Sequence, residues 1–263
     1  MLRCPQCDAA PAPGGDTCPG CGRRLRSPRG GLDLLTDAER AEADRFTADY
    51  VELRTREGWV GGGAREDPQG GNPRLWRDRS DLVARAARLM RDEIGESPLV
   101  LDVGAGGGWA AGRLGGARVI AIDLLDVGEG DGLSVRGDMR RLPVRDAAAD
   151  AALYAASLHY APVMESVPEA ARVLRPGGLL IALDSPLYSY AQSTELAAKR
   201  SASYFEQAGH PGLAAHYHPI DRGLLRETLV ASGFDVLQLT AGARWRALLR
   251  RSPGSFVVAR RLT

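Results

Sequence analysis

Short apolar runs, each bounded by glycine, proline or aspartate, alternate with stretches of helical spacing over the last two thirds of the chain. Uninterrupted apolar runs of this length are typical of parallel strands buried on both faces of a sheet. The last two runs leave little room for a crossover helix, so we expect them to pair antiparallel at one edge. The pattern predicts an α/β protein with a doubly wound, mostly parallel, seven-stranded sheet, its strands at residues 99–103, 119–123, 133–137, 151–155, 179–183, 234–240 and 255–262.

Helical spacing appears in three places. Residues 37–56 carry apolar positions among charges and follow Thr36 and Asp37, either of which suits a helix start. Residues 75–94 and 195–207 also read as helices, the second lying over a pocket. Residues 61–73 are rich in glycine and proline, and a lid and a plain connector are equally good interpretations. We expect a small domain at residues 1–30, a helical linker with this loop at 31–74, and the main domain at 75–263.

Composition narrows the class of protein. Apolar residues make up 44% and charged residues 25% of the chain, which suits a globular core. The net charge of +1 predicts neither a strongly cationic nucleic-acid binder nor an acidic tail. No apolar run approaches the roughly 20 residues that span a bilayer, and the first residues lack the apolar stretch of a signal peptide. We therefore expect a cytoplasmic protein that does not enter a membrane.

All four cysteines lie near the start of the chain, in the pattern CxxC, ten residues, CxxC. Four thiolates make a closed tetrahedral shell for Zn²⁺, and a closed shell is structural because no water reaches the metal. Two reducible disulfides or a redox CxxC are the alternatives. The segment resembles a zinc ribbon, and whether it binds a substrate, a partner or its own chain stays open. The predicted metal ligands are Cys4, Cys7, Cys18 and Cys21.

A glycine-rich turn, Asp102-Val-Gly-Ala-Gly-Gly-Gly108, closes the first predicted strand, and we expect it to open a helix. Glycines let the backbone approach a ligand closely, and a helix N-terminus offers free N–H groups. The dinucleotide pattern GxGxxG fails because Trp109 stands at its sixth position, and no Gly-Lys-Ser/Thr of a phosphate-binding loop follows. Asp102 is badly placed beside a pyrophosphate but suits a cationic ligand.

The sequence D-x-G-x-G-x-G resembles the signature of class I S-adenosylmethionine-dependent methyltransferases, and the resemblance covers residues 75–263. It implies a Rossmann-like fold, the glycine loop beside the methionine part of the cofactor, Asp123 on the ribose hydroxyls and Asp138 at the adenine amine. Residues 172–178 match the helix exit before the fifth strand. The implied residues that bind S-adenosyl-L-methionine are Asp102, Gly104, Ala105, Gly106, Gly108, Asp123, Leu124, Asp138, Met139 and Ser157.

The residues after the fourth strand carry the candidate chemistry. Related enzymes often have a leucine-histidine pair there, facing the methyl group, so His159 is a candidate for orienting the acceptor or removing its proton, with Tyr160 beside it. A histidine satisfied by nearby backbone is an equally good interpretation. The Asn/Asp-Pro-Pro-Tyr/Phe motif of base-amine methylation is absent from the sequence. The predicted catalytic domain also contains no cysteine for pyrimidine C5-methylation.

Two later segments should border the acceptor. The loop at residues 184–190 contains Tyr188 and Tyr190, whose rings could stack on a flat substrate or cover the core. Three histidines, His210, His216 and His218, lie close together beyond it. We favour a pocket-capping insertion over a second metal site, because no cysteine completes a ligand set.

These features favour a methyltransferase that acts on a small-molecule acceptor. The second hypothesis is an RNA methyltransferase, because a four-cysteine ribbon joined to this fold resembles the bacterial large-subunit ribosomal RNA guanine-N1 methyltransferases, although the cysteine spacing differs. The third is a protein that binds the cofactor without catalysis. A basic groove between ribbon and sheet would favour RNA, and an enclosed apolar pocket over the glycine loop would favour a metabolite.

Overall fold

The structure is a computed structural model, and it describes all of the chain except residues 13, 60–72, 127–132 and 242–253. The glycine- and proline-rich segment suggested as a lid lies outside the described residues, apart from Pro73. None of the helices in the described ranges combines the length and the apolar character that crossing a bilayer requires.

A central sheet runs through the molecule in the order β1-β4-β3-β2-β5-β6-β10-β9. All neighbours pair in parallel except β10, which is antiparallel to both β6 and β9, as the sequence predicted for the C-terminal edge. The seven predicted strands are present, and an eighth short strand, β1, pairs with β4. The strands are β1 Leu32–Asp33, β2 Leu99–Val103, β3 Arg118–Asp123, β4 Leu133–Arg136, β5 Ala149–Ala155, β6 Leu174–Leu183, β9 Phe234–Thr240 and β10 Phe256–Arg261, while β7 Leu187–Tyr188 and β8 Ile220–Asp221 form a separate pair.

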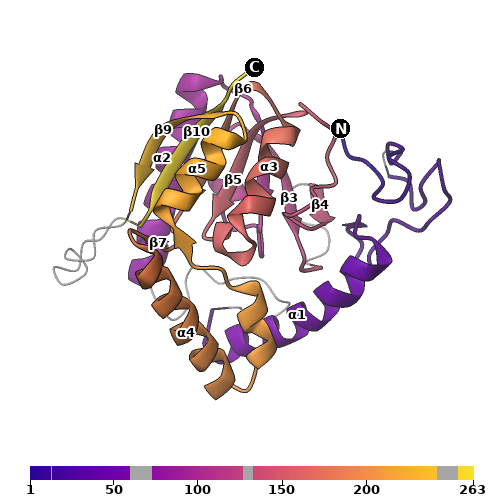
Figure 1. Ribbon diagram of the computed structural model, residues 1–263. Helices are drawn as coiled ribbons and strands as arrows, with labels where there is room; N and C mark the ends of the chain where they lie inside the picture. Colours follow the sequence, from indigo (N-terminus) through magenta and orange to yellow (C-terminus); the bar gives the residue numbers. More distant parts are fainter. Residues whose placement is uncertain (13, 60–72, 127–132, 242–253) are drawn as a thin grey trace.

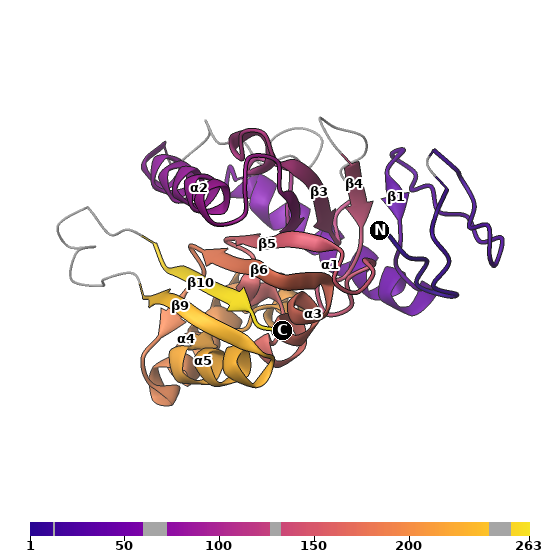
Figure 2. The ribbon, with the colours of Figure 1, turned by 90° about the horizontal axis from the view of Figure 1, so that it is seen from above.

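Helices cover both faces of the sheet (Figure 2). Along β2, Val100 packs with α2 on one face, whereas Leu101 and Val103 belong to the core that contains α3 and α5. This alternation is the expected result of a strand with period two and two apolar faces. The helices are α1 Asp37–Arg56, α2 Pro73–Glu93, α3 Val163–Val173, α4 Ala191–Gln207 and α5 Arg222–Ala231, with the 3-10 turns η1 Ala111–Arg113, η2 Leu158–Tyr160 and η3 Pro211–His216.

The prediction of a helix directly after the glycine loop is wrong. Turns follow Gly108, and the only helical element between β2 and β3 is the three-residue η1. The reason lies in the connection itself, which is short and contains Gly112, Gly115 and Gly116. Gly115 and Gly116 adopt positive φ values of 27° and 80°, which an α-helix does not tolerate.

Helix α1 begins as predicted and lies across the end of the sheet at which the parallel strands terminate (Figure 1). Thr36 is its N-cap, and the side chains of Thr36 and Glu39 complete a reciprocal capping box. Within the helix, Phe46, Tyr50 and Arg54 recur every four residues and so share one face. The helix packs against the segment that contains η3, where Phe46 meets the ring of His216 at 4.5 Å.

The N-terminal segment packs against the main domain rather than standing apart from it. Leu2 forms an antiparallel bridge with Val144, and Cys4 and Cys18 are buried in the same apolar core as Val135. The predicted boundary at residue 30 between the small domain and the linker is also held against the main domain. Ser27 is buried, and its hydroxyl donates to Asp126 at 2.8 Å.

Candidate active site

The glycine loop leaves β2 in a conformation that only glycine adopts easily. Gly104, Gly106 and Gly108 have φ values of 70°, 54° and 79°. At Gly104 a Cβ would stand 2.4 Å from the Cβ of Ser157, so this position has no room for a side chain. The Ser157 hydroxyl in turn donates to the carbonyl of Val103, which joins the end of β5 to the end of β2.

Asp102 is fully buried beneath this loop, and within the described part of the chain neither of its carboxylate oxygens has a hydrogen-bond partner. Burial, with a smaller effect from nearby Asp123, raises the pKa of the Asp102 carboxyl to about 7. An unpaired buried carboxylate costs free energy unless a charge or a donor satisfies it. The position therefore fits a ligand that brings positive charge close to the loop.

Asp123 ends β3 and lines the pocket above the glycine loop. Its two oxygens accept the backbone N–H groups of Gly106 at 2.7 Å and Leu125 at 2.8 Å. Burial raises the pKa of this carboxyl, although those hydrogen bonds oppose the shift. Carboxylate oxygens have more than one lone pair each, so the group can still accept from hydroxyls of a ligand.

Asp138 follows β4 and is held by its neighbour Arg140. The Arg140 guanidinium donates to Asp138 at 2.7 Å and also reaches Glu42 of α1 at 3.1 Å. Both residues and Met139 between them line the pocket. This end of the pocket is therefore tied to α1 by an ion-pair network.

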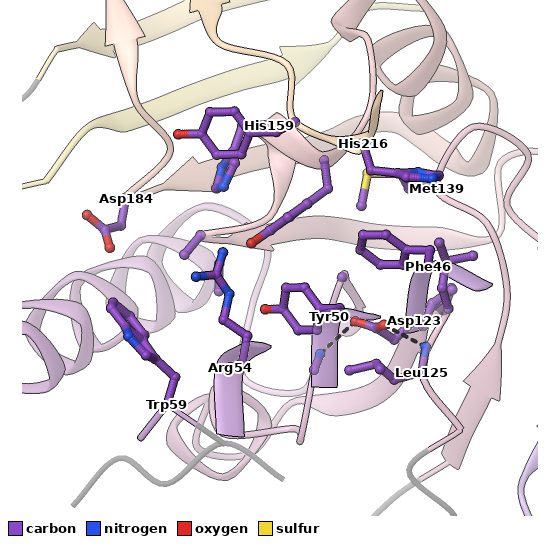
Figure 3. Close-up of a pocket in the computed structure, with 18 of the residues that line it drawn as sticks. Phe46, Tyr50, Arg54, Trp59, Asp123, Leu125, Met139, His159, Asp184 and His216 are labelled. Atoms are coloured by element: carbon purple, nitrogen blue, oxygen red, sulfur yellow. Dashed lines mark hydrogen bonds between the residues drawn. The ribbon is translucent and has the colours of Figure 1, made fainter. Parts of the chain in front are cut away.

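One cavity of about 360 Å³ joins these groups to a second, ring-rich region (Figure 3). Asp123, Leu125 and Met139 lie at one end, and Trp59 and Asp184 lie at the other, with Tyr50 and Arg54 of α1 between them. We call these the cofactor end and the acceptor end, because the resemblance implies S-adenosylmethionine at the first. Of the residues predicted from the sequence, the cavity is lined by Gly104, Gly106, Asp123, Leu124, Asp138, Met139, His159 and Tyr160.

The remaining predicted cofactor residues do not line the cavity. Asp102 and Ser157 are buried behind the loop, Ala105 is buried with its N–H donating to Ile122, and Gly108 forms a turn with Ala105. Ala105, Gly108 and Ser157 shape the loop in this structure, and their contact with a ligand stays a prediction.

His159 lies on η2 and is buried against the cavity. Its Nδ1 is 3.2 Å from the Ser185 hydroxyl, and its backbone carbonyl accepts the N–H of His218 at 2.7 Å. Burial, together with the positive charges of Arg79 and Arg54, lowers the pKa of His159 to about 3. The ring is therefore neutral at physiological pH and a weak base, which suits orientation of an acceptor better than removal of its proton.

Two arginines and their acidic partners frame the acceptor end. Arg79 of α2 pairs with Asp184 at 2.6 Å and lies over the rings of Trp59 and Trp76. Arg54 pairs with Glu57 at 2.6 Å. The aromatic rings here come from Trp59, Tyr160 and Tyr217, whereas the two tyrosines predicted in the 184–190 loop, Tyr188 and Tyr190, do not line the cavity, and Tyr190 is 73% exposed.

The three histidines beyond α4 do not gather into a metal site. His216 lines the cavity, His210 lies 3.3 Å from Asp49 of α1, and His218 bonds the backbone of His159. Among the described residues, the metal-type cluster is the one formed by the cysteines. The capping role favoured for this insertion agrees with these contacts.

The four cysteine sulfurs lie within 4.8 Å of one another. The Cys4–Cys21 and Cys7–Cys18 sulfur distances are 3.8 Å and 3.5 Å. Bonds of about 2.3 Å to a tetrahedral Zn²⁺ would separate the sulfurs by about 3.8 Å. These distances fit a structural zinc ion and are far longer than the ~2.05 Å of a disulfide bond.

Sequence reasoning missed the part that α1 plays in the pocket. Phe46, Tyr50 and Arg54 were assigned to a linker helix, although their four-residue spacing already marks one face. No pattern in the sequence indicated that Trp59 and Arg79 line the pocket, because their neighbours in space come from distant parts of the chain.

Comparison with known proteins supports the fold and the class. Residues 101–182 match a family model described as a methyltransferase domain. Uncharacterized methyltransferases of Mycobacterium tuberculosis and Mycobacterium bovis are 39% identical to this chain over 90 residues, which is 31% of the chain and 37% of each relative. The chain thus spans little more than a third of the length of the curated relatives it matches.

Solved structures extend the likeness over most of the chain. A 1,6-didemethyltoxoflavin-N1-methyltransferase of Burkholderia thailandensis is 19% identical, with a TM-score of 0.52 and coverage of 92% of this chain and 99% of that one. A putative sarcosine dimethylglycine methyltransferase of Galdieria sulphuraria is 16% identical, with the same score and coverage of 86% and 99%. The [4+2]-cyclase SpnF is 17% identical, scores 0.51 and covers 85% and 94%.

At these identities the solved structures establish the fold. Residues 101–182 match a methyltransferase domain, and the sheet order and the solved structures show that this segment belongs to a Rossmann-like methyltransferase fold. The likeness to a cyclase shows that the same fold also occurs in a protein named for a different reaction.

Proposed function

We propose that this protein transfers a methyl group from S-adenosylmethionine to a small, flat acceptor molecule. The observation that carries the proposal is the single cavity that runs from the glycine loop to the ring-rich acceptor end beneath α1 (Figure 3). A concave cavity of this size, lined by aromatic rings and a few polar groups, suits a small metabolite.

The residues of the cofactor end fit S-adenosylmethionine. Behind the loop, Asp102 carries a buried carboxylate with no partner among the described residues. In the cavity, Asp123 offers acceptor oxygens to a pair of sugar hydroxyls, and Gly104 leaves room for backbone contact. When bound, this cofactor supplies an electrophilic methyl group on a positively charged sulfur. The protein's own task is to align the acceptor and to keep water away.

At the acceptor end, the cavity is lined by aromatic rings and by the neutral imidazole of His159. Trp59, Tyr160 and Tyr217 provide aromatic faces for a planar molecule. Nε2 of neutral His159 has no hydrogen-bond partner among the described residues, and it would orient a polar atom of the acceptor. The charges of Arg54 and Arg79 are already paired with acids, which favours an uncharged acceptor over an anionic one. The solved methyltransferase bound to 1,6-didemethyltoxoflavin and S-adenosylhomocysteine is consistent with a small-molecule acceptor.

RNA is the second candidate, because arginines of the N-terminal segment line a groove beside α1. Several of the arginines that line this groove already form ion pairs within the protein. Arg26 pairs with Asp16 at 2.8 Å, and Arg40 pairs with Asp33 at 2.9 Å. Arg136 also pairs with Asp33, at 3.5 Å. A cation that already has a partner gives little counterion release on a phosphate backbone, so the groove supports RNA binding less strongly than the cavity supports a metabolite.

Binding of the cofactor without catalysis is the third candidate. It would call for a blocked or missing acceptor site, whereas the cavity extends past Tyr160 to Trp59 and Asp184.

The test is a transfer assay with S-adenosylmethionine labelled in its methyl group. Purified protein is incubated separately with total RNA and with a metabolite extract. We expect label in the small-molecule fraction, and loss of that label with the Asp123→Ala variant. Label in RNA alone would replace the proposal with the second candidate, and label in neither fraction despite tight cofactor binding would favour the third.

A further inference from the structure

The loop that follows β4 faces the pocket on one side and the cysteines on the other. Met139 and Arg140 line the cofactor end, and the next residue, Arg141, donates to the carbonyl of Pro5 at 3.2 Å. Pro5 lies inside the first cysteine turn, directly after Cys4. One peptide bond therefore separates a residue of the pocket from a residue that holds the cysteine turn.

Further contacts fasten the N-terminal segment to the same loop. The N–H of Arg3 donates to Pro143 at 3.0 Å, and the N–H of Arg145 donates to Met1 at 2.8 Å. With the bridge between Leu2 and Val144, these bonds pair the chain before Cys4 with the loop after Arg141.

Arg141 also holds the first turn of α1. Its guanidinium donates to both oxygens of Glu39, at 2.8 Å and 2.7 Å, in the two-pronged geometry that makes arginine–carboxylate pairs strong. Glu39 is at the same time the capping residue that bonds Thr36. Burial alone would raise the pKa of Glu39, but the hydrogen bonds from Arg141 and Thr36 outweigh it and lower the pKa.

The second cysteine turn reaches the same helix. Arg23, two residues after Cys21, donates to the carbonyl of Leu35 at 2.8 Å, immediately before the Thr36 cap. The second cysteine turn thus contacts the residue before the start of α1 directly, and the first reaches α1 through Arg141. Farther along the helix, Phe46 and Tyr50 line the pocket (Figure 3).

From this arrangement we propose that metal binding at the four cysteines and cofactor binding in the pocket strengthen each other, through Arg141, Glu39 and helix α1. The proposal rests on the proposed function for the identity of the cofactor. A cysteine segment of this size has too few apolar residues to fold without its metal, so the metal orders Pro5 and, through Arg141, both the pocket loop and α1. The N-terminal segment then serves its own chain rather than reaching for RNA.

Thermodynamic linkage makes the coupling reciprocal, with factors of roughly 5–150 typical of coupled sites. We expect S-adenosylhomocysteine to bind the zinc-loaded chain about tenfold more tightly than the chelator-treated full-length chain. Saturating S-adenosylhomocysteine should raise the affinity for Zn²⁺ by the same factor, read with a chromophoric chelator. Equal affinities for S-adenosylhomocysteine with and without zinc, in chains of equal helical content, would overturn the proposal.

A substitution of Glu39, which links Arg141 to α1, tests the proposal even if the metal-free chain unfolds. Glu39→Gln retains the capping box, since glutamine also serves at that position, but loses the charge that pairs with Arg141. We expect this variant to bind one zinc and to bind S-adenosylhomocysteine about threefold more weakly than the wild type, which is the size expected for an ion pair partly exposed to solvent. The matched control is Glu195→Gln, an exposed acid on α4.

The outcomes separate this inference from the proposed function. Zinc-loaded wild-type protein without affinity for S-adenosylhomocysteine would contradict the proposed function. Wild-type affinity in zinc-loaded Glu39→Gln would contradict the coupling route alone and leave the proposed function standing. Reduced affinity in Glu39→Gln with wild-type affinity in Glu195→Gln would support the route.

Discussion

The two ends of the pocket are built in different ways. The cofactor end is lined by backbone and short side chains at the ends of β2, β3 and β4, namely the turn at Gly104, Asp123 and Asp138. At the acceptor end, long side chains meet from α1, α2 and the segment after α4, as Arg54, Arg79 and Tyr217 illustrate. The first end depends on local chain geometry, and the second depends on packing between distant elements.

This difference teaches which part of the activity can vary. A backbone turn that admits only glycine has few alternatives, whereas rings on α1 can be exchanged without disturbing the sheet. We therefore expect substitutions at the cofactor end to abolish binding of the cofactor. Substitutions at the acceptor end should change the choice of acceptor and leave the cofactor in place.

The largest effect should come from Gly104→Ala. The new Cβ would meet Ser157 at 2.4 Å in a backbone with φ +70°. Overpacking and strain of about 1–3 kcal/mol each predict a loss of affinity for S-adenosylhomocysteine of about 100-fold or more. Gly108→Ala is the matched control, because its φ is +79° but nothing lies within 4 Å of its Cβ. Calorimetry showing equal losses in both would refute the steric argument.

The next effect should be that of Asp123→Ala. The substitution removes the acceptor oxygens at the end of β3 and frees the N–H groups of Gly106 and Leu125. Hydrogen bonds to charged groups contribute about 1.5–3 kcal/mol, so affinity should fall roughly 10–100-fold. Asp235→Ala, at an exposed position of β9, serves as the control. An unchanged calorimetric Kd for Asp123→Ala would contradict the ribose assignment.

A pH titration should reveal the ionisation of the buried Asp102 carboxyl. Its folded-state pKa of about 7 exceeds the ~3.9 of an unfolded chain, so the free energy of unfolding of the cofactor-free protein falls as pH rises from about 4 to about 7. The sulfonium of S-adenosylmethionine prefers the ionised carboxylate, so the affinity for S-adenosylmethionine should rise about tenfold from pH 6 to pH 8. We expect Asp102→Asn to bind weakly and without this dependence, and a wild-type slope in that variant would assign the titration to another group.

The smallest effect on the cofactor should come from Trp59→Ala, at the acceptor end. The affinity for S-adenosylhomocysteine should stay within about twofold, because Trp59 lies at the opposite end from Asp123 (Figure 3). The kcat/KM for an acceptor found by the labelling assay should fall about 2- to 10-fold, since a ring contact contributes about 0.5–1.5 kcal/mol. Tyr190→Ala removes an exposed ring outside the cavity and is the control. A large loss of cofactor affinity in Trp59→Ala would erase the distinction between the two ends.

The same distinction explains what the sequence predicts well. Strands such as Leu99–Val103 and Phe234–Thr240 occur as predicted, because apolar runs between turn residues are a local signal. The strand β1 was missed because two residues carry no periodicity. The expected helix after the glycine loop failed because the glycines of that connection favour turns.

The candidate site divides in the same manner. The glycine turn and the acids at strand ends are visible in the sequence, since their spacing follows from the sheet. The position of Tyr50 and Arg54 over the pocket is not visible, because it depends on where α1 packs after the chain has passed through the N-terminal segment. The loop at residues 184–190 borders the cavity through Asp184 and Pro186, whereas its two tyrosines do not line it: Tyr188 lies in β7, and Tyr190 is exposed.

The central claim, a glycine-loop pocket for a positively charged sulfur cofactor, is tested most directly by calorimetry on the purified, zinc-loaded chain at pH 8. We predict that S-adenosylmethionine and S-adenosylhomocysteine each bind at one molecule per chain, and that neither a nicotinamide dinucleotide nor ATP displaces them. Absence of binding by both sulfur compounds, together with tight binding of a nicotinamide dinucleotide or ATP, would contradict the account.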